Sequence, residues 1–270
     1  MALTLMSEVS GFFVNIDDGE AHYLKVLCDE LFERDNFIRN IVWQKRTSPD
    51  MRATVGDGHD HILLFAKDSA GFGGYAKRLP KTPEQRKAFY NPDNDPRGPW
   101  VSSDFTAQGY RPNQMYKIVT PGGAEYYPPE GRCWKNVESV YLQLVREGRM
   151  WFGHDGRGVP RRKTYLSESE ENAVWSWWTN REVGHNQEAK KESIGFFGVS
   201  GAFMTPKPER LVRRIVHISS DSRSTSLDFF AGSGTTGHAV INLNREDGGR
   251  RKFILVEMAG YFDTVLLPRI

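Results

Sequence analysis

The chain has 270 residues, of which 39% are hydrophobic and 26% charged, with a formal net charge of +2 at pH 7. This composition is typical of a globular protein that buries a sizeable core. No apolar run reaches the length of a membrane span, and MALTLMSEVS lacks the features of a signal peptide, so we expect a cytoplasmic protein with no membrane partner. Cys28 and Cys133 match no metal-ligand spacing and are expected to be reduced and structural.

The first segment predicts a strand followed by a helix. Residues 11–16, GFFVNI, form a short apolar run bounded by Gly11 and by DDGE, which indicates a buried strand. Asp17 or Asp18 is suited to cap the helix that follows, whose apolar positions fall at i, i+3, i+4 and i+7: Leu24, Leu27, Cys28 and Leu31. Because ALTLM resembles the end of a helix, the chain is expected to enter an α/β fold already under way.

Residues 36–46 and 59–68 predict two further strands, joined by the polar loop TSPDMRATVGDG. Alternation along the second strand puts His59 and His61 on one face. With no further ligand nearby in the sequence, we expect no metal site there. The acidic residues that open the preceding helix are interpreted as a cap favoured by the helix dipole: Asp17, Asp18 and Glu20.

From about residue 75 to 195 the periodicity fades, and the segment reads as an inserted, loop-rich module. It holds 19 Lys and Arg against 15 Asp and Glu, a net charge of +4, and six of the seven tryptophans: Trp100, Trp134, Trp151, Trp175, Trp177 and Trp178. Basic groups among aromatics suit a nucleic-acid surface, although a tryptophan-rich core is the favoured interpretation of these residues alone. Arg161, Arg162 and Lys163 are candidate phosphate contacts, with solvated loop charge as the alternative.

Regular α/β signals return after this module. Pro206 and Pro208 precede a predicted helix, and the segments TSLDFF, TTGHAVINLNR and RKFILVEM then predict a strand, a helix and a strand. Gly232, Gly234 and Gly237 satisfy G-x-G-x-x-G between the first two, and Glu257 ends the last. This spacing indicates a nucleoside ligand, with a tight packing turn as the alternative. Walker-type phosphate binding is excluded, because Thr235 and Thr236 stand where a lysine is required.

Two features favour S-adenosylmethionine over a nicotinamide dinucleotide. The carboxylate of Asp228, directly before FFAGSG, suits a cationic ligand and would repel a pyrophosphate. A dinucleotide fold also needs further strands after RKFILVEM, where only AGYFDTVLLPRI follows. The remaining strands must therefore come from earlier residues.

That order resembles the permuted amino-methyltransferases that act on DNA. DFFAGSGTT is similar to their cofactor motif, FMTPKPERLVRRIV to the segment before it, and RKFILVEM to the strand whose acid holds the ribose hydroxyls. Four further segments look like the modification subunit of type III restriction systems: IDDGEAHYLKVLCDELF, NPDNDPRGPW, EYYPPEGRCW and VGHNQEAKKE. The resemblance covers nearly the whole chain.

The resemblance implies a permuted, incomplete Rossmann-like α/β methyltransferase fold that transfers a methyl group from S-adenosylmethionine to the adenine amine of a specific DNA site. It implies a catalytic-half segment at 1–74, a target-recognition region at 75–195 and a cofactor-binding segment at 196–270. It also implies double-stranded DNA, a restriction subunit and a second modification subunit as partners. The implied cofactor contacts are Asp228, Phe229, Ala231, Gly232, Ser233, Gly234, Thr235, Glu257, Thr205, Lys207 and Pro208.

The family positions the target amine with an Asp-Pro-Pro-Tyr loop, and this sequence contains none. Its one Pro-Pro pair, Pro128-Pro129, stands between Tyr127 and Glu130. We therefore expect no catalytic residue in this chain, a missing N-terminal segment, and cofactor binding without methylation. Two alternatives remain open: a non-catalytic DNA-binding or subunit-interaction remnant, and one half of a split methyltransferase.

Overall fold

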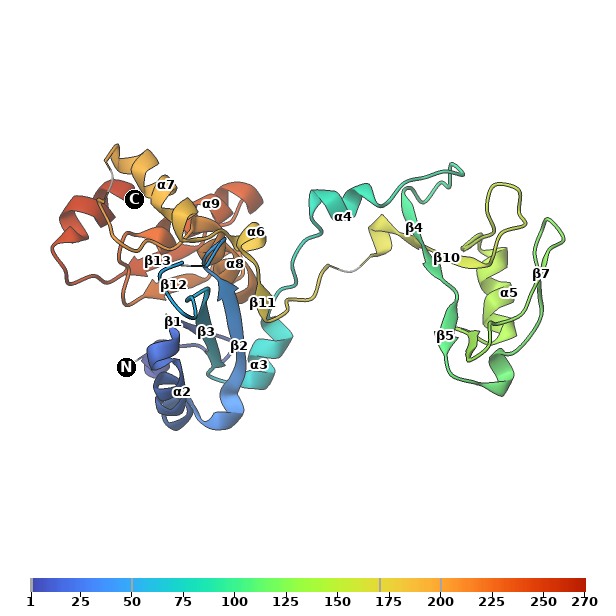
Figure 1. Ribbon diagram of the computed structural model, residues 1–270, viewed down its shortest axis with the longest axis horizontal. Helices are drawn as coiled ribbons and strands as arrows, with labels where there is room; N and C mark the ends of the chain where they lie inside the picture. Colours follow the sequence, from blue (N-terminus) through green and yellow to red (C-terminus); the bar gives the residue numbers. More distant parts are fainter. Residues whose placement is uncertain (1, 50, 170, 200) are drawn as a thin grey trace. The chain divides into compact units, whose positions relative to one another are not determined.

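The computed structural model describes residues 2–49, 51–169, 171–199 and 201–270. Asp50, within the loop expected between the second and third strands, therefore lies outside the described residues. The chain divides into two compact units. Unit 1 combines residues 1–79 with 173–270, and unit 2 is the intervening segment 80–172. Figure 1 shows unit 1 in blue and in orange to red, and unit 2 mainly in green and yellow.

The first half of unit 1 is built around a four-stranded sheet of order β1-β3-β2-β11. β3 pairs antiparallel with both β1 and β2, while β11 pairs parallel with β2. The elements up to residue 79 are α1 (Ala2–Leu5), β1 (Gly11–Ile16), α2 (Asp18–Phe32), η1 (Arg34–Asn36), β2 (Phe37–Gln44), β3 (His59–Ala66) and α3 (Ser69–Tyr75). The strands and helix predicted over this segment are confirmed.

The buried face of α2 differs from the expected one. Ala21, Cys28 and Phe32 are its buried residues, whereas Leu27 and Leu31 are exposed. Phe32 explains the difference, because its ring lies 4.9 Å from that of Phe12 and 5.5 Å from that of Phe65. A large aromatic side chain at this position turns the helix so that the row ending at Phe32 faces the sheet.

The second half of unit 1 returns to the sheet before forming a βαβ unit. Its elements are β11 (Trp177–Trp178), α6 (Asn180–Val183), α7 (Asn186–Phe197), α8 (Glu209–Ser219), β12 (Thr225–Asp228), α9 (Thr235–Asp247), β13 (Lys252–Leu255), η4 (Phe262–Leu266) and α10 (Leu267–Arg269). β12 and β13 pair in parallel as a sheet of two strands, with α9 as their crossover. The predicted βαβ unit is confirmed, but among the described residues its strands are not hydrogen-bonded to the four-stranded sheet.

Unit 2 is narrower than the expected segment 75–195. Residues 173–195 join unit 1 because Trp178 and Val183 are fully buried against Trp43 in its core. The Trp43 indole N–H also donates to the carbonyl of Gly184, at 3.0 Å. A long-range core contact of this kind leaves no periodic signal in the segment itself.

Among the described residues, unit 2 consists of short strands and two α-helices, α4 and α5. Its elements are α4 (Pro83–Lys87), β4 (Trp100–Asp104), β5 (Thr106–Gln108), η2 (Pro112–Gln114), β6 (Ile118–Val119), β7 (Glu125–Tyr126), β8 (Arg132–Trp134), α5 (Glu138–Arg146), β9 (Met150–Trp151), β10 (Arg161–Tyr165) and η3 (Leu166–Glu168). β10 lies between β4 and β9 in a three-stranded sheet. Trp100 and Trp134 are buried in this unit, as the tryptophan-core interpretation expects, whereas Trp175 and Trp177 are exposed in unit 1.

Cys28 and Cys133 are free and buried, as expected. Within the part of the chain that the structure describes, no helix combines the length and the apolar character needed to cross a bilayer.

Candidate functional site

The glycine-rich loop of unit 1 joins β12 to α9. Gly232 and Gly234 have φ angles of +52° and +77°, in the left-handed region where a side chain is strained. A Cβ on Gly232 would lie 3.0 Å from the ring of Phe203. The loop closes with a 2.8 Å hydrogen bond from the Gly234 N–H to the carbonyl of Ala231. Glycine is therefore required here by backbone conformation as well as by space.

Glu257 follows β13 and binds the loop directly. Its carboxylate accepts from the backbone N–H groups of Gly232 at 2.9 Å, Met258 at 2.9 Å and Ala259 at 3.0 Å. These hydrogen bonds, chiefly that from Ala259, hold the pKa of Glu257 below its usual value. An ionised acid thus holds the glycine loop against the end of β13.

Asp228 is the last residue of β12, and its carboxylate also turns toward the loop. One oxygen accepts from the Phe230 N–H at 3.0 Å, and the other accepts from the Thr236 hydroxyl at 2.5 Å. A carboxylate offers about four acceptor positions, so Asp228, which accepts two hydrogen bonds, retains capacity for a ligand, whereas a ligand hydroxyl at Glu257 would take the position of the Tyr261 hydroxyl, its fourth donor. The structure therefore brings together the two acids that the sequence singles out, one on each side of the loop.

Apolar side chains stand exposed beside the two acids. Phe230 is 90% exposed and Met258 is 94% exposed. Phe203 lies close to the loop, with its ring 4.9 Å from that of Tyr261 in an edge-on arrangement. Large exposed apolar groups near fixed carboxylates are compatible with a ligand that has both apolar and polar parts. Phe229 and Ala231, two of the expected contacts, are respectively half-buried and buried.

Ser233 and Thr235 are turned away from this surface. Both are buried, and both hydroxyls accept from the Arg269 guanidinium, at 2.9 and 3.0 Å. Their hydroxyls are therefore not directed at a ligand on the loop. Sequence reasoning missed Arg269, because a single arginine near the chain end carries no spacing signal.

The three expected cofactor contacts in the segment before α8 differ in their exposure and in their partners. Thr205 is exposed, and Pro208 is buried as the N-cap residue of α8. The Lys207 ammonium pairs with Asp60 at 3.0 Å and lies 5.1 Å from the centre of the Trp43 ring. Lys207 is therefore held by the four-stranded sheet, and its backbone carbonyl accepts from the Thr235 hydroxyl at 3.3 Å.

In unit 2, the three basic residues of β10 differ in their exposure to solvent. Arg161 and Arg162 are exposed, whereas Lys163 is buried. The Lys163 ammonium forms ion pairs with Asp93 and Asp95, the latter at 2.9 Å. The burial of Lys163 and its two carboxylate partners withhold its charge from solvent, and this argues against the expected phosphate contact.

Two cavities lie elsewhere in unit 1. One, of about 290 Å³, is lined by residues at the end of β2 and the start of α7, including Lys45, Arg46 and Lys190. The other, of about 660 Å³, includes Gln44, Arg181 and Arg210. The glycine loop lines neither of these two cavities.

A glycine-rich loop after a parallel strand, with one acid at the end of that strand and a second just after the next strand, is typical of nucleoside-binding α/β folds. Comparison with known families extends this assignment. Residues 2–264 match the N6/N4 DNA methylase family, and the chain belongs to this family.

Individual relatives include modification enzymes of two restriction types. The chain is 36% identical over 265 residues to the StyLTI Mod subunit, a type III restriction-modification enzyme of Salmonella typhimurium, covering 94% of the chain and 38% of the relative. It is 29% identical over 266 residues to the type II methyltransferase M.KpnI of Klebsiella pneumoniae, covering 90% and 61%. The chain thus spans less than two thirds of each relative.

Two solved structures resemble the chain more distantly. One is a DNA modification methylase of Thermus thermophilus complexed with S-adenosyl-L-methionine, at 15% identity and a TM-score of 0.45, covering 99% of this chain and 71% of that one. The other is the M1.HpyAVI complex with the same cofactor, at 14% identity and a TM-score of 0.41, covering 99% and 77%. Similarity at this level does not define the geometry of the site.

Proposed function

We propose that the glycine loop of unit 1 binds S-adenosylmethionine. The observation that carries this proposal is the pair of carboxylates, Asp228 and Glu257, fixed by backbone N–H groups on either side of the loop. The cofactor carries a cationic sulfonium and amine, two ribose hydroxyls and an adenine ring. Glu257 is suited to accept from the hydroxyls, Asp228 to face the positive charge, and Phe230 with Met258 to cover the ring.

The reaction that fits this cofactor and the DNA methylase family is methyl transfer to an exocyclic amine of a DNA base, and the resemblance to type III modification subunits favours the amine of adenine. The amine nitrogen forms a bond to the methyl carbon as the carbon–sulfur bond breaks, and the nitrogen then loses a proton. Asp-Pro-Pro-Tyr, which the family uses to hold the amine, does not occur in this sequence. We infer that the chain binds the cofactor but does not methylate DNA by itself.

Among DNA methylases, the modification subunit of a type III restriction system is the assignment we favour for this chain. Its support is the set of long motifs in the family's order and the 36% identity to the StyLTI Mod subunit. In this setting double-stranded DNA is the substrate, and a restriction subunit and a second modification subunit are partners. Unit 2 supplies the target-recognition region, with Arg161 and Arg162 as exposed candidates for phosphate contact.

The test is calorimetric titration of S-adenosylmethionine into the purified chain and three variants. Asp228→Asn and Glu257→Gln are each expected to weaken binding at least about tenfold, because each removes a charge at the ligand surface. Glu130→Gln, at an exposed position of unit 2, is the matched control and is expected to bind as the wild type. Circular dichroism checks that every variant is folded.

Four results would point elsewhere or refine the assignment. Binding that survives both substitutions would place the cofactor away from the glycine loop. No binding by a folded wild type, together with DNA affinity, would favour a non-catalytic DNA-binding remnant. Binding of a nicotinamide dinucleotide in preference to S-adenosylmethionine would favour an oxidoreductase. If the cofactor binds and methylation appears only when a separate polypeptide with Asp-Pro-Pro-Tyr is added, the chain is one half of a split enzyme.

A further inference from the structure

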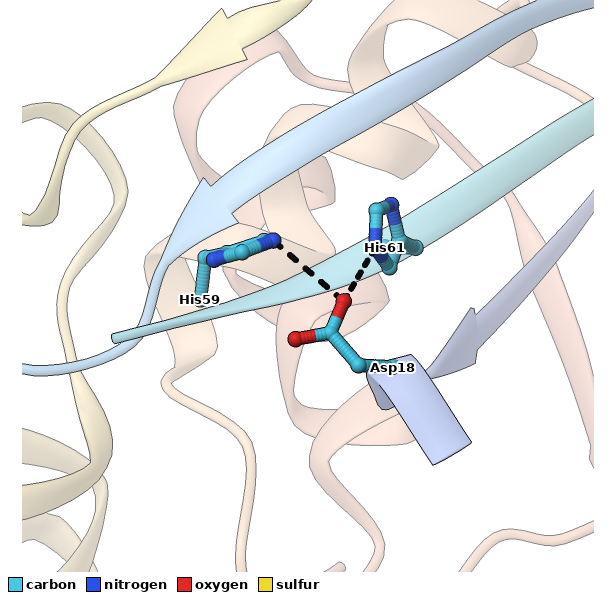
Figure 2. Close-up of side chains that lie close together, drawn as sticks. All are labelled: Asp18, His59 and His61. Atoms are coloured by element: carbon cyan, nitrogen blue, oxygen red, sulfur yellow. Dashed lines mark hydrogen bonds and ion pairs between the residues drawn. The ribbon is translucent and has the colours of Figure 1, made fainter. Parts of the chain in front are cut away.

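Three potential metal ligands converge at the start of α2 (Figure 2). Nε2 of His61 lies 2.7 Å from an oxygen of Asp18, and Nε2 of His59 lies 3.5 Å from the same oxygen. The ligand atoms of all three residues lie within 4.8 Å of one another. They come from two elements, since Asp18 opens α2 while both histidines belong to β3.

The strand register brings these residues together. β1 pairs antiparallel with β3 so that Ile16, its last residue, is opposite His61. α2 begins two residues later, and its first turn therefore lies over the end of β3 that carries His59 and His61. The expectation of no metal site rested on the lack of a third ligand nearby in the sequence, and Asp18 is 41 positions before His59.

The other ring nitrogen of His61, Nδ1, contacts the side chain of Asn40. This nitrogen lies 2.9 Å from the amide nitrogen of Asn40 and 3.2 Å from the amide oxygen. If the amide presents its oxygen, Nδ1–H donates to it and Nε2 keeps a lone pair directed at Asp18. A hydrogen bond to the far nitrogen in this manner is the usual support of a metal-binding histidine.

We propose that Asp18, His59 and His61 bind one divalent transition-metal ion of the zinc class, with water completing its coordination. Imidazole and carboxylate are the ligands that zinc accepts beside thiolate, and three protein ligands with water is a common set. Metal–ligand distances of about 2.1 Å place tetrahedral ligand atoms about 3.4 Å apart. The 3.5 Å separation already fits this, and small side-chain rotations open the 2.7 Å contact.

The surroundings permit an ion to enter. The Asp18 side chain is 60% exposed and that of His61 12% exposed, so the site opens to solvent on the carboxylate side. Beyond His61 and His59, Lys45 also acts on Asp18, and the charge of Lys45 is balanced by Asp57 and Asp60, each at 2.7 Å. His22, one turn along α2 from Asp18, has its ring 6.5 Å from that of His61.

The experiment is a titration of ZnCl₂ into the chain, without an affinity tag, by calorimetry, with Co²⁺ absorption as a report of coordination geometry. We expect one ion per chain. His59→Ala, His61→Ala and Asp18→Asn are each expected to weaken zinc binding at least about tenfold, and Asn40→Ala to weaken it about tenfold through His61. His154→Ala, at an exposed histidine of unit 2, is the control and is expected to bind as the wild type.

Asp18→Asn keeps the variant folded, because the N-cap bond from the Gly19 N–H is accepted by Asp17. A melting temperature that rises with zinc in the wild type, but not in Asp18→Asn, is the second expected result. Absence of zinc binding tighter than about 0.1 mM, or binding that all three ligand substitutions leave unchanged, overturns the proposal. Neither result bears on S-adenosylmethionine binding, which is measured with a different ligand and different variants.

Discussion

Replacing Lys163 with methionine distinguishes a core residue from a DNA contact. Methionine keeps the approximate length of the lysine side chain and removes its charge. In unit 2 the Lys163 ammonium lies between Asp93 and Asp95 and 5.1 Å from the centre of the Trp100 ring. The substitution therefore leaves two carboxylates without a shared cation in a largely buried setting.

The expected loss of stability is about 3 kcal/mol, the lower end of the range for breaking a buried ion pair. The lower end applies because Asp95 keeps other partners. It still accepts from the Arg97 guanidinium at 2.8 and 2.9 Å and from the Tyr165 hydroxyl at 2.7 Å. A loss of this size lowers the ratio of folded to unfolded unit 2 by about two orders of magnitude.

The assay is urea unfolding followed by tryptophan fluorescence, since Trp100 stacks in the affected core. Arg162→Met, on the neighbouring exposed position, is the control and is expected to change stability by less than about 0.5 kcal/mol. DNA binding is measured in parallel at several salt concentrations. The loss of one phosphate contact reduces the slope of log affinity against log salt concentration by about 0.9 in magnitude. If Lys163→Met leaves the unfolding midpoint unchanged and lowers the salt dependence instead, the core role is refuted.

Three further predictions concern the loop, the pH dependence and the core. Gly232→Ala, at φ +52°, is expected to destabilise unit 1 by about 1–2 kcal/mol and weaken S-adenosylmethionine binding, measured by thermal shift with and without cofactor. Hydrogen bonds from Arg97 in particular lower the pKa of Asp95. The ionised Asp95 therefore stabilises unit 2 above about pH 4, and this contribution is lost progressively as the pH falls below that value. Asp95→Asn is expected to reduce the difference in stability that urea titrations measure between pH 7 and pH 3. Phe65→Ala, at a fully buried position of β3, is expected to cost about 3–5 kcal/mol in the same assay, whereas Leu31→Ala, exposed on α2, is expected to cost less than about 1 kcal/mol.

Local patterns predicted most elements of unit 1, since they are encoded by neighbouring residues. GFFVNI and the HDHILLFA run became β1 and β3, and the glycine loop fell between β12 and α9. The boundary of the inserted segment was not predictable in this way, because it depends on Trp178 reaching Trp43 across the whole of unit 2 in the sequence. The buried face of α2 likewise depended on the distant ring of Phe65.

The residues of the candidate site also differ in whether local sequence patterns predicted them. Asp228 and Glu257 were predictable, because a glycine loop and the ends of two strands have a fixed spacing. Arg269 was not, since its hydrogen bonds to Ser233 and Thr235 depend on how the last residues fold back under the loop. The approach of Asp18 to His59 and His61 arises from the register between β1 and β3, which the sequence alone does not specify.

The pairing of β11 with β2 has a consequence for the kinetics of folding. The Trp43 indole and its Gly184 acceptor are 141 residues apart in the sequence, with all of unit 2 between them. Closing a flexible loop of that length costs about 4 kcal/mol of chain entropy. Prior formation of unit 2 would shorten the effective loop to its two connecting segments. The fourth strand of the sheet is therefore expected to form late, with a rate that depends on how soon the inserted unit has folded.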